Sequence, residues 1–73
     1  MTKEEFAQVV LDSTDSLYRI SKSILKHDAD CEDAVQEAIT IAFEKLHTLR
    51  KDCYAKTWLV RIVMNECYKI ARR

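Results

Sequence analysis

Residues 30–46 read DCEDAVQEAITIAFEKL, and the helical pattern of this stretch is the best starting point for predicting the fold. Its apolar residues recur at intervals of three and four, the spacing that places side chains on one face of an α-helix. Asp28 is a good N-cap residue, and acidic side chains in the first turn interact favourably with the helix dipole. The pattern therefore predicts an amphipathic helix that begins near Asp28, ends between His47 and Leu49, and has the following apolar face: Cys31, Val35, Ala38, Ile39, Ala42, Leu46 and Leu49.

The opposite side of this helix is a narrow polar stripe flanked by Ile41 and Phe43. Carboxylates and an amide at helical spacing, beside apolar side chains, suit a basic helix of a partner protein. The same pattern also describes an ordinary solvated helix face, which is the alternative. We call this set the acidic stripe; it consists of Asp33, Gln36, Glu37, Thr40 and Glu44.

A long amphipathic helix is predicted before this segment, from about Thr2 to Lys26. Thr2 followed by Glu5 is a capping-box pattern at its start. The polar run DSTDS at residues 12–16 has poor helix propensity, so this helix could bend or break near Ser13.

A third helix is predicted from about Tyr54 to Ala71, with Asp52 as a plausible N-cap. One side of it is broadly apolar and suits the interior of a bundle. That side consists of Leu59, Val60, Val63, Met64, Cys67, Ile70 and Ala71.

The composition favours an all-α fold. A chain of 73 residues makes one small domain, which buries only about 60% of the surface that its unfolded form exposes. Neither Gly nor Pro occurs, and tight turns and hairpins depend on those residues. We therefore predict a single all-α domain over residues 1–73, a compact bundle of three main helices, or four if the first is broken.

The outer side of the third helix combines an aromatic ring with cations. The apolar side of this helix is complete without Trp58, which falls instead near Arg61, Asn65 and Lys69. An aromatic ring can stack on a base while nearby cations hold phosphates, as single-stranded nucleic acid requires. The alternative is that Trp58 packs against the second helix and that the cations form a solvated face.

The charges are separated along the chain, although they sum to zero. Residues 1–47 hold five Lys and Arg against ten Asp and Glu, and residues 48–73 hold seven Lys and Arg against two acidic residues. The first part thus has a net charge of −5 and the second of +5. A basic segment with aromatics suits nucleic acid, and an acidic segment suits a protein partner.

The sequence gives little support for catalysis or for a bound metal. It contains no HExxH motif, no Gly-rich phosphate loop and no CxxC pair. We therefore expect no enzyme activity, no cofactor and no metal, and we expect Cys31 and Cys67 to be small buried residues. A metal-binding regulatory domain that uses Cys31, Cys53 and His27 is a rival interpretation.

No apolar run approaches the length of a membrane span, and the N-terminus lacks a signal-peptide pattern. We therefore expect a cytoplasmic protein without a membrane partner.

Two linked motifs resemble a known family. The run DCEDAVQEA at residues 30–38, followed by Phe43 and Leu46, is similar to the region 2.2 signature of bacterial RNA polymerase sigma factors. The run TWLVRI at residues 57–62, with Asn65, is similar to the region 2.3–2.4 signature. The chain is most similar to the extracytoplasmic-function (ECF) group of the sigma-70 family, and the resemblance covers nearly all of it.

The resemblance implies a partner for each of the two faces. The acidic stripe would dock on the coiled coil of the polymerase β′ subunit. The outer side of the third helix would recognise and melt the promoter −10 element and bind its non-template strand, with one base flipped into a pocket near the preceding connection. The DNA-binding residues would be Lys56, Thr57, Trp58, Arg61, Asn65, Lys69 and Arg72.

The chain also departs from the family pattern. Ala55 and Leu59 occupy two positions at which housekeeping factors have aromatics, which implies weaker melting and a need for a well-matched promoter. A complete ECF factor carries a second domain that reads the −35 element; none is present here, so we expect a fragment or truncated form with low promoter affinity of its own. An anti-sigma protein is a further implied partner, and a helical adaptor that binds only proteins is the alternative function.

Overall fold

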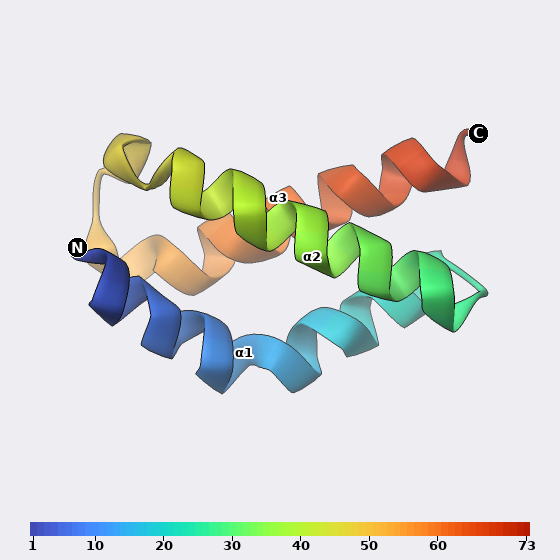
Figure 1. Cartoon of the computed structure of the whole chain (residues 1–73), viewed down its shortest axis with the longest axis horizontal. Coiled ribbons are helices and arrows are strands. Elements are labelled where there is room, and N and C mark those ends of the chain that lie inside the picture. Colours follow the sequence, from blue (N-terminus) through green and yellow to red (C-terminus); the bar gives the residue numbers. More distant parts are fainter.

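The computed structural model describes all residues from Met1 to Arg73 and confirms an all-α bundle of three main helices. In Figure 1, α1 and α3 run in the same direction across the molecule, and α2 runs in the opposite direction and crosses in front of α3. The first helix is not broken, so the four-helix form does not occur. The elements are α1 (Lys3–Ile24), α2 (Asp28–Glu44), the short 3-10 turns η1 (Leu46–Thr48) and η2 (Asp52–Tyr54), and α3 (Ala55–Ala71).

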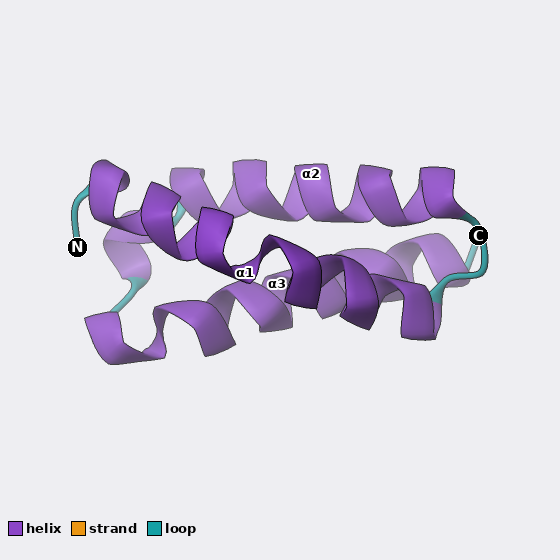
Figure 2. Cartoon of the chain, turned by 90° about the horizontal axis from the view of Figure 1, so that it is seen from below, coloured by secondary structure: helices purple, strands orange, loops and turns teal.

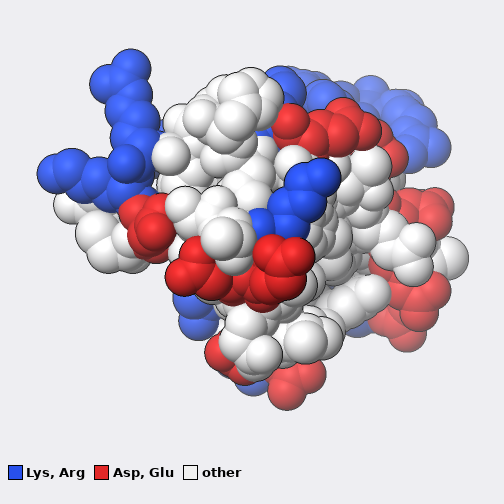
Figure 3. Space-filling view, turned by 60° about the vertical axis from the view of Figure 1, so that its left-hand side comes forward, with Lys and Arg blue, Asp and Glu red and all other residues white.

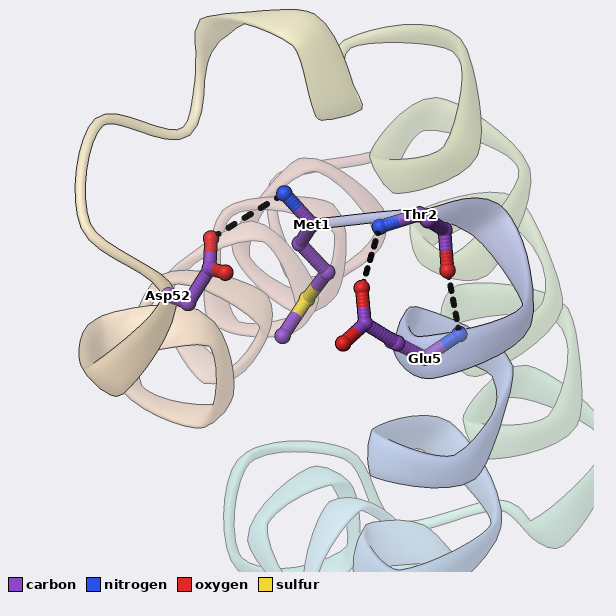
Figure 4. A network of polar contacts seen from close by, with 4 residues as sticks. All are labelled: Met1, Thr2, Glu5 and Asp52. Atoms are coloured by element: carbon purple, nitrogen blue, oxygen red, sulfur yellow. Dashed lines mark hydrogen bonds and ion pairs between the residues drawn. The ribbon is translucent and has the colours of Figure 1, made fainter.

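The start of α1 is fixed by the predicted capping box (Figure 4). The backbone N–H of Glu5 donates to Thr2 Oγ1 at 3.1 Å, and the backbone N–H of Thr2 donates to Glu5 Oε1 at 2.8 Å. These hydrogen bonds hold the pKa of the Glu5 carboxyl below its usual value, because they favour the charged form. They also satisfy backbone donors that a helix start leaves free.

Packing overrides the weak helix propensity in the middle of α1. Ser13 is only 2% exposed and lies on the buried side of the helix between Phe6 and Leu17. The hydroxyl of Thr14 donates to the backbone carbonyl of Val10 at 2.9 Å, a bond that bends helices. The helix accordingly bows but stays continuous over its length (Figure 1).

The core lies where the three helices meet, and α1 crosses in front of α3 in the view of Figure 2. The ring of Phe6 is fully buried and packs edge-on against Phe43, with ring centroids 5.1 Å apart. Leu59 and Val63 of α3 and Ala38 of α2 are equally buried. The apolar face predicted for α2 thus faces the interior. Phe43, which was predicted to flank the acidic stripe, is partly buried and packs against the core.

Two predicted N-caps are wrong, and each carboxylate has another partner. His27, not Asp28, is the N-cap of α2, and the Asp28 carboxylate pairs with Lys22 of α1. Tyr54 is the N-cap of α3, and Asp52 pairs with the amino group of Met1 at 3.2 Å (Figure 4). The short connection between α1 and α2 places Asp28 beside Lys22, and the packing of the bundle places Asp52 beside the amino group of Met1.

The cysteines follow the prediction of small buried residues. Cys31 and Cys67 are buried and Cys53 is exposed, and all three are free thiols. Burial raises the pKa of the Cys31 thiol, since it disfavours the thiolate. No group of three His, Cys, Asp or Glu side chains comes together in a way that could hold a metal ion.

None of the helices has the length and apolar character needed to traverse a lipid bilayer.

Candidate nucleic-acid interface

Trp58 has two roles in the structure. It is partly buried, and its ring packs edge-on against Phe6 with centroids 5.8 Å apart. The prediction that Trp58 lies on the outer side of the third helix, apart from the core, is therefore correct only in part, because the ring also packs against Phe6 of α1. The rest of the ring lies at the surface, where it borders two hollows.

One hollow lies between the connection after α2 and the first turns of α3. Its apolar part comes from Leu49, Tyr54 and Trp58, and its volume is about 460 Å³. Tyr54 is 57% exposed, so most of its ring is free. The cations around the hollow are Arg50, Lys51 and Arg61, and Thr57 completes its lining. We call this the aromatic hollow.

Most of the remaining predicted DNA-binding residues share an exposed side of α3, but Lys56 falls on nearly the opposite side of the helix. At 3.6 residues per turn, Arg61, Asn65 and Arg72 fall within about 60° of one another. None of these three is committed to a hydrogen bond or ion pair with another side chain of the chain. Lys69 differs, because its ammonium group pairs with the carboxylate of Glu66 at 2.9 Å. The exposed members of the predicted set are Lys56, Thr57, Arg61, Asn65, Lys69 and Arg72.

The acidic stripe is exposed along α2, as the periodicity predicted. Its side chains make few contacts of their own: the hydroxyl of Thr40 donates to the backbone carbonyl of Gln36 at 3.1 Å. Asp33, Gln36, Glu37 and Thr40 form one wall of a furrow whose other wall is the last part of α3. Glu44 lies beyond this furrow, near the end of α2.

The two candidate faces meet in this furrow. Glu66 and Lys69 line the part beside the acidic stripe, and they also line its continuation beside Ile41, Trp58 and Asn65. Glu66 is 9% exposed and is the one charged residue of α3 that is buried. The acidic and basic faces are thus adjacent, with the Glu66–Lys69 ion pair at their border.

The fold also interleaves charges that are separated along the chain. Figure 3 shows the end of the molecule that holds the N-terminus: basic side chains project at its upper margins, and acidic side chains lie across its centre. Because α2 and α3 pack closely against each other, the halves of opposite charge lie side by side. The charge separation of the sequence therefore becomes a set of neighbouring patches.

Four residues of the aromatic hollow, Leu49, Arg50, Lys51 and Tyr54, were not in the predicted DNA-binding set. Arg50, Lys51 and Tyr54 lie in the connection or at its end, where helical periodicity gives no signal. The available signal was a pair of cations followed closely by an aromatic residue, just before the helix that carries Trp58. Glu66 was missed because a lone carboxylate on an apolar side is read as exposed.

Comparison with known proteins agrees with the helices and motifs. The profile of the family described as Sigma-70 region 2 matches residues 10–73. The "ECF RNA polymerase sigma factor SigM" of two Mycobacterium tuberculosis strains, Erdman and H37Rv, is 33% identical over 57 residues. That match covers 78% of this chain and 29% of the relative, so the chain spans under a third of the relatives' length.

No solved structure matches this chain. The resemblance to region 2 of an ECF sigma factor is nevertheless confirmed by the family profile, which covers both motifs, and by the relatives, which are named as ECF sigma factors. The chain belongs to the Sigma-70 region 2 family, the family of transcription-initiation sigma factors.

Proposed function

We propose that this domain docks on the coiled coil of the RNA polymerase β′ subunit and recognises and melts the promoter −10 element. The acidic stripe of α2 contacts β′, and the exposed side of α3, with the aromatic hollow, binds the non-template strand. The domain acts in the cytoplasm, and an anti-sigma protein that covers the same faces regulates it. Family membership supports the general role, and the geometry of the two faces supports this division.

The aromatic hollow is the observation that carries the DNA-binding part of the proposal. Tyr54 and Trp58 offer rings against which an unpaired base can stack, and such stacking contributes about 1–3 kcal/mol per base. Arg50, Lys51 and Arg61 surround the rings and suit the phosphates on either side of that base. Extrusion of a base costs a few kcal/mol, which these contacts offset.

The departures from the housekeeping pattern fit weak melting. Ala55 and Leu59 are both buried, at 2% and 0% exposure, so they offer no ring to the strand. Trp58 commits one edge to Phe6. Tyr54 and the free part of Trp58 are then the aromatic surface of the hollow, and a promoter with a well-matched −10 sequence is needed to compensate.

The acidic stripe supports the docking part of the proposal. All five of its side chains are exposed, and its carboxylates form no ion pair within the chain. Helical spacing lets them present one continuous row to a basic partner helix. A charge at the centre of such an interface typically changes affinity by 2–5 kcal/mol when one partner is removed.

A salt titration tests the DNA-binding part. The affinity of the domain for a −10 non-template oligonucleotide is measured by fluorescence anisotropy at several salt concentrations. Arg61→Ala removes one phosphate contact and should reduce the slope of log affinity against log salt by about 0.7. Arg19→Ala removes an exposed arginine from α1 and is the matched control. Equal slopes for the two variants would contradict the assignment, and complete absence of DNA binding would favour the adaptor function.

A pull-down with the purified β′ coiled coil tests the docking part. Asp33→Asn should weaken binding at least tenfold, since it removes a carboxylate from the stripe. Asp15→Asn, an exposed position on α1, is the matched control and should bind as the wild type does. Loss of binding in both variants, or in neither, would refute the assignment of the docking face to α2.

A further inference from the structure

Tyr68 is an exposed aromatic residue in the second half of α3. It is 44% exposed, whereas a large aromatic side chain is usually mostly buried. Its ring makes no aromatic contact with another ring of the protein. The interior of the bundle therefore does not account for a tyrosine at this position.

Tyr68 lies among the residues of the candidate DNA-binding face. Arg61, Asn65 and Arg72 precede or follow it by seven, three and four residues, so all lie on the same side of α3. Tyr68 also borders hollows on both of its sides, one next to Met64 and one that it shares with Trp58. The ring thus lies between two depressions, with the guanidinium group of Arg61 about two helical turns before it and that of Arg72 about one turn after it.

We propose that Tyr68 is a second stacking contact for the nucleic-acid strand that binds at Trp58, an inference that rests on the proposed function. The two residues are ten positions apart, which corresponds to about 15 Å along a helix at 1.5 Å per residue. A stacked strand advances about 3.4 Å per nucleotide, so the rings are separated by about four nucleotides. Arg61 and Asn65 lie between them and suit the intervening phosphates.

The charges around Tyr68 favour an anionic partner, such as nucleic acid, over a basic or apolar protein partner. Arg61 and Arg72 are exposed cations on its side of α3. The one carboxylate in the second half of α3 is Glu66, which is buried and paired with Lys69. An isolated tyrosine between cations matches the aromatic and basic interleaving of single-strand binding surfaces.

Oligonucleotides of graded length test this inference. The affinity of the domain for single strands of about four and about ten nucleotides is measured at low salt by fluorescence anisotropy. For the wild-type domain, the longer strand should bind more tightly. Tyr68→Ala should lower the affinity for the longer strand about five- to tenfold and leave the short strand almost unaffected. Tyr68→Phe should retain the affinity for the longer strand, because it keeps the ring.

The outcomes separate the two proposals. Both proposals are supported if Tyr54→Ala abolishes binding of the short strand and if the longer strand binds more tightly than the short one only when Tyr68 is present. Short-strand binding that depends on Tyr54, without any effect of Tyr68→Ala on the longer strand, overturns the inference and leaves the proposed function intact. Equal losses in Tyr68→Phe and Tyr68→Ala would mean that the hydroxyl group makes the contact and would overturn stacking. If neither strand binds, the proposed function and the inference both fail.

Discussion

Replacement of Phe6 should reveal how strongly α1 supports the candidate DNA-binding site. Phe6 has no exposed surface, and its ring makes edge-on contacts with Phe43 and Trp58 at centroid distances of 5.1 and 5.8 Å. Aromatic pairs of this kind contribute about 0.5–1.5 kcal/mol each beyond the burial of area. Phe6→Leu keeps most of the apolar volume but loses both contacts, so we expect a loss of about 1–3 kcal/mol.

Phe6→Ala should cost more, about 3–5 kcal/mol, because it also leaves a cavity. A domain of 73 residues has a free energy of unfolding of roughly 4–11 kcal/mol at typical values per residue. The alanine variant is therefore expected to be at or near the limit of folding. The leucine variant should remain folded, with its Tm lowered by about 4–8 °C for each kcal/mol lost.

Urea denaturation followed by circular dichroism at 222 nm measures these losses. Leu11→Ala, at a 69% exposed position of the same helix, is the control and should change the free energy of unfolding by less than about 0.5 kcal/mol. The leucine variant should also bind the −10 oligonucleotide less tightly, since the Trp58 ring loses its support. A Phe6→Ala variant that is as stable as Leu11→Ala would refute this account of the core.

Thiol chemistry, acid titration and salt provide the other tests. In the native domain, a maleimide reagent should label Cys53 rapidly. It should label Cys31 and Cys67 only after unfolding, because burial keeps both thiols inaccessible. Mass spectrometry counts the labels, and rapid labelling of all three cysteines would contradict the buried positions. Hydrogen bonds lower the pKa of Glu5, and Lys22 lowers that of Asp28, below their ordinary values of 4.5 and 3.8. These carboxylates contribute their full stabilisation at pH values above their ordinary pKa values, and the stabilisation is lost as the pH falls through the lowered pKa values. The urea concentration at the midpoint of unfolding should therefore be lower at pH 3 than at pH 6. Glu5→Gln should show a smaller fall, and an identical fall in the variant would exclude Glu5 as a contributor. Finally, affinity for single-stranded DNA should fall with salt concentration, whereas a salt-independent affinity would exclude phosphate contacts.

Helical periodicity predicted the architecture well, because burial of an apolar face is what holds each helix in place. Val35, Ala38, Leu59 and Val63 are buried as predicted, whereas Ala71, at the end of the apolar side predicted for α3, is exposed. Periodicity says little about helix ends, however, where a carboxylate can cap the helix or pair with a cation from elsewhere in the fold. Asp28 takes the second option, since α1 brings Lys22 beside it.

The candidate site was predictable only where it lies on a helix. The exposed positions of Arg61 and Asn65 follow from the spacing along α3. The support of Trp58 by Phe6 does not, because the two residues are 52 positions apart and meet only through the packing of α1 on α3. The aromatic hollow depends in the same way on how the connection after α2 folds back towards Tyr54.

The furrow over Glu66 and Lys69 has a consequence for inhibitor design. Because this one ion pair borders both the acidic stripe and the exposed side of α3, a small molecule seated over it would cover part of both proposed interfaces. Such a compound would need a cationic and an anionic group, spaced so that they can pair with Glu66 and Lys69, and little apolar surface.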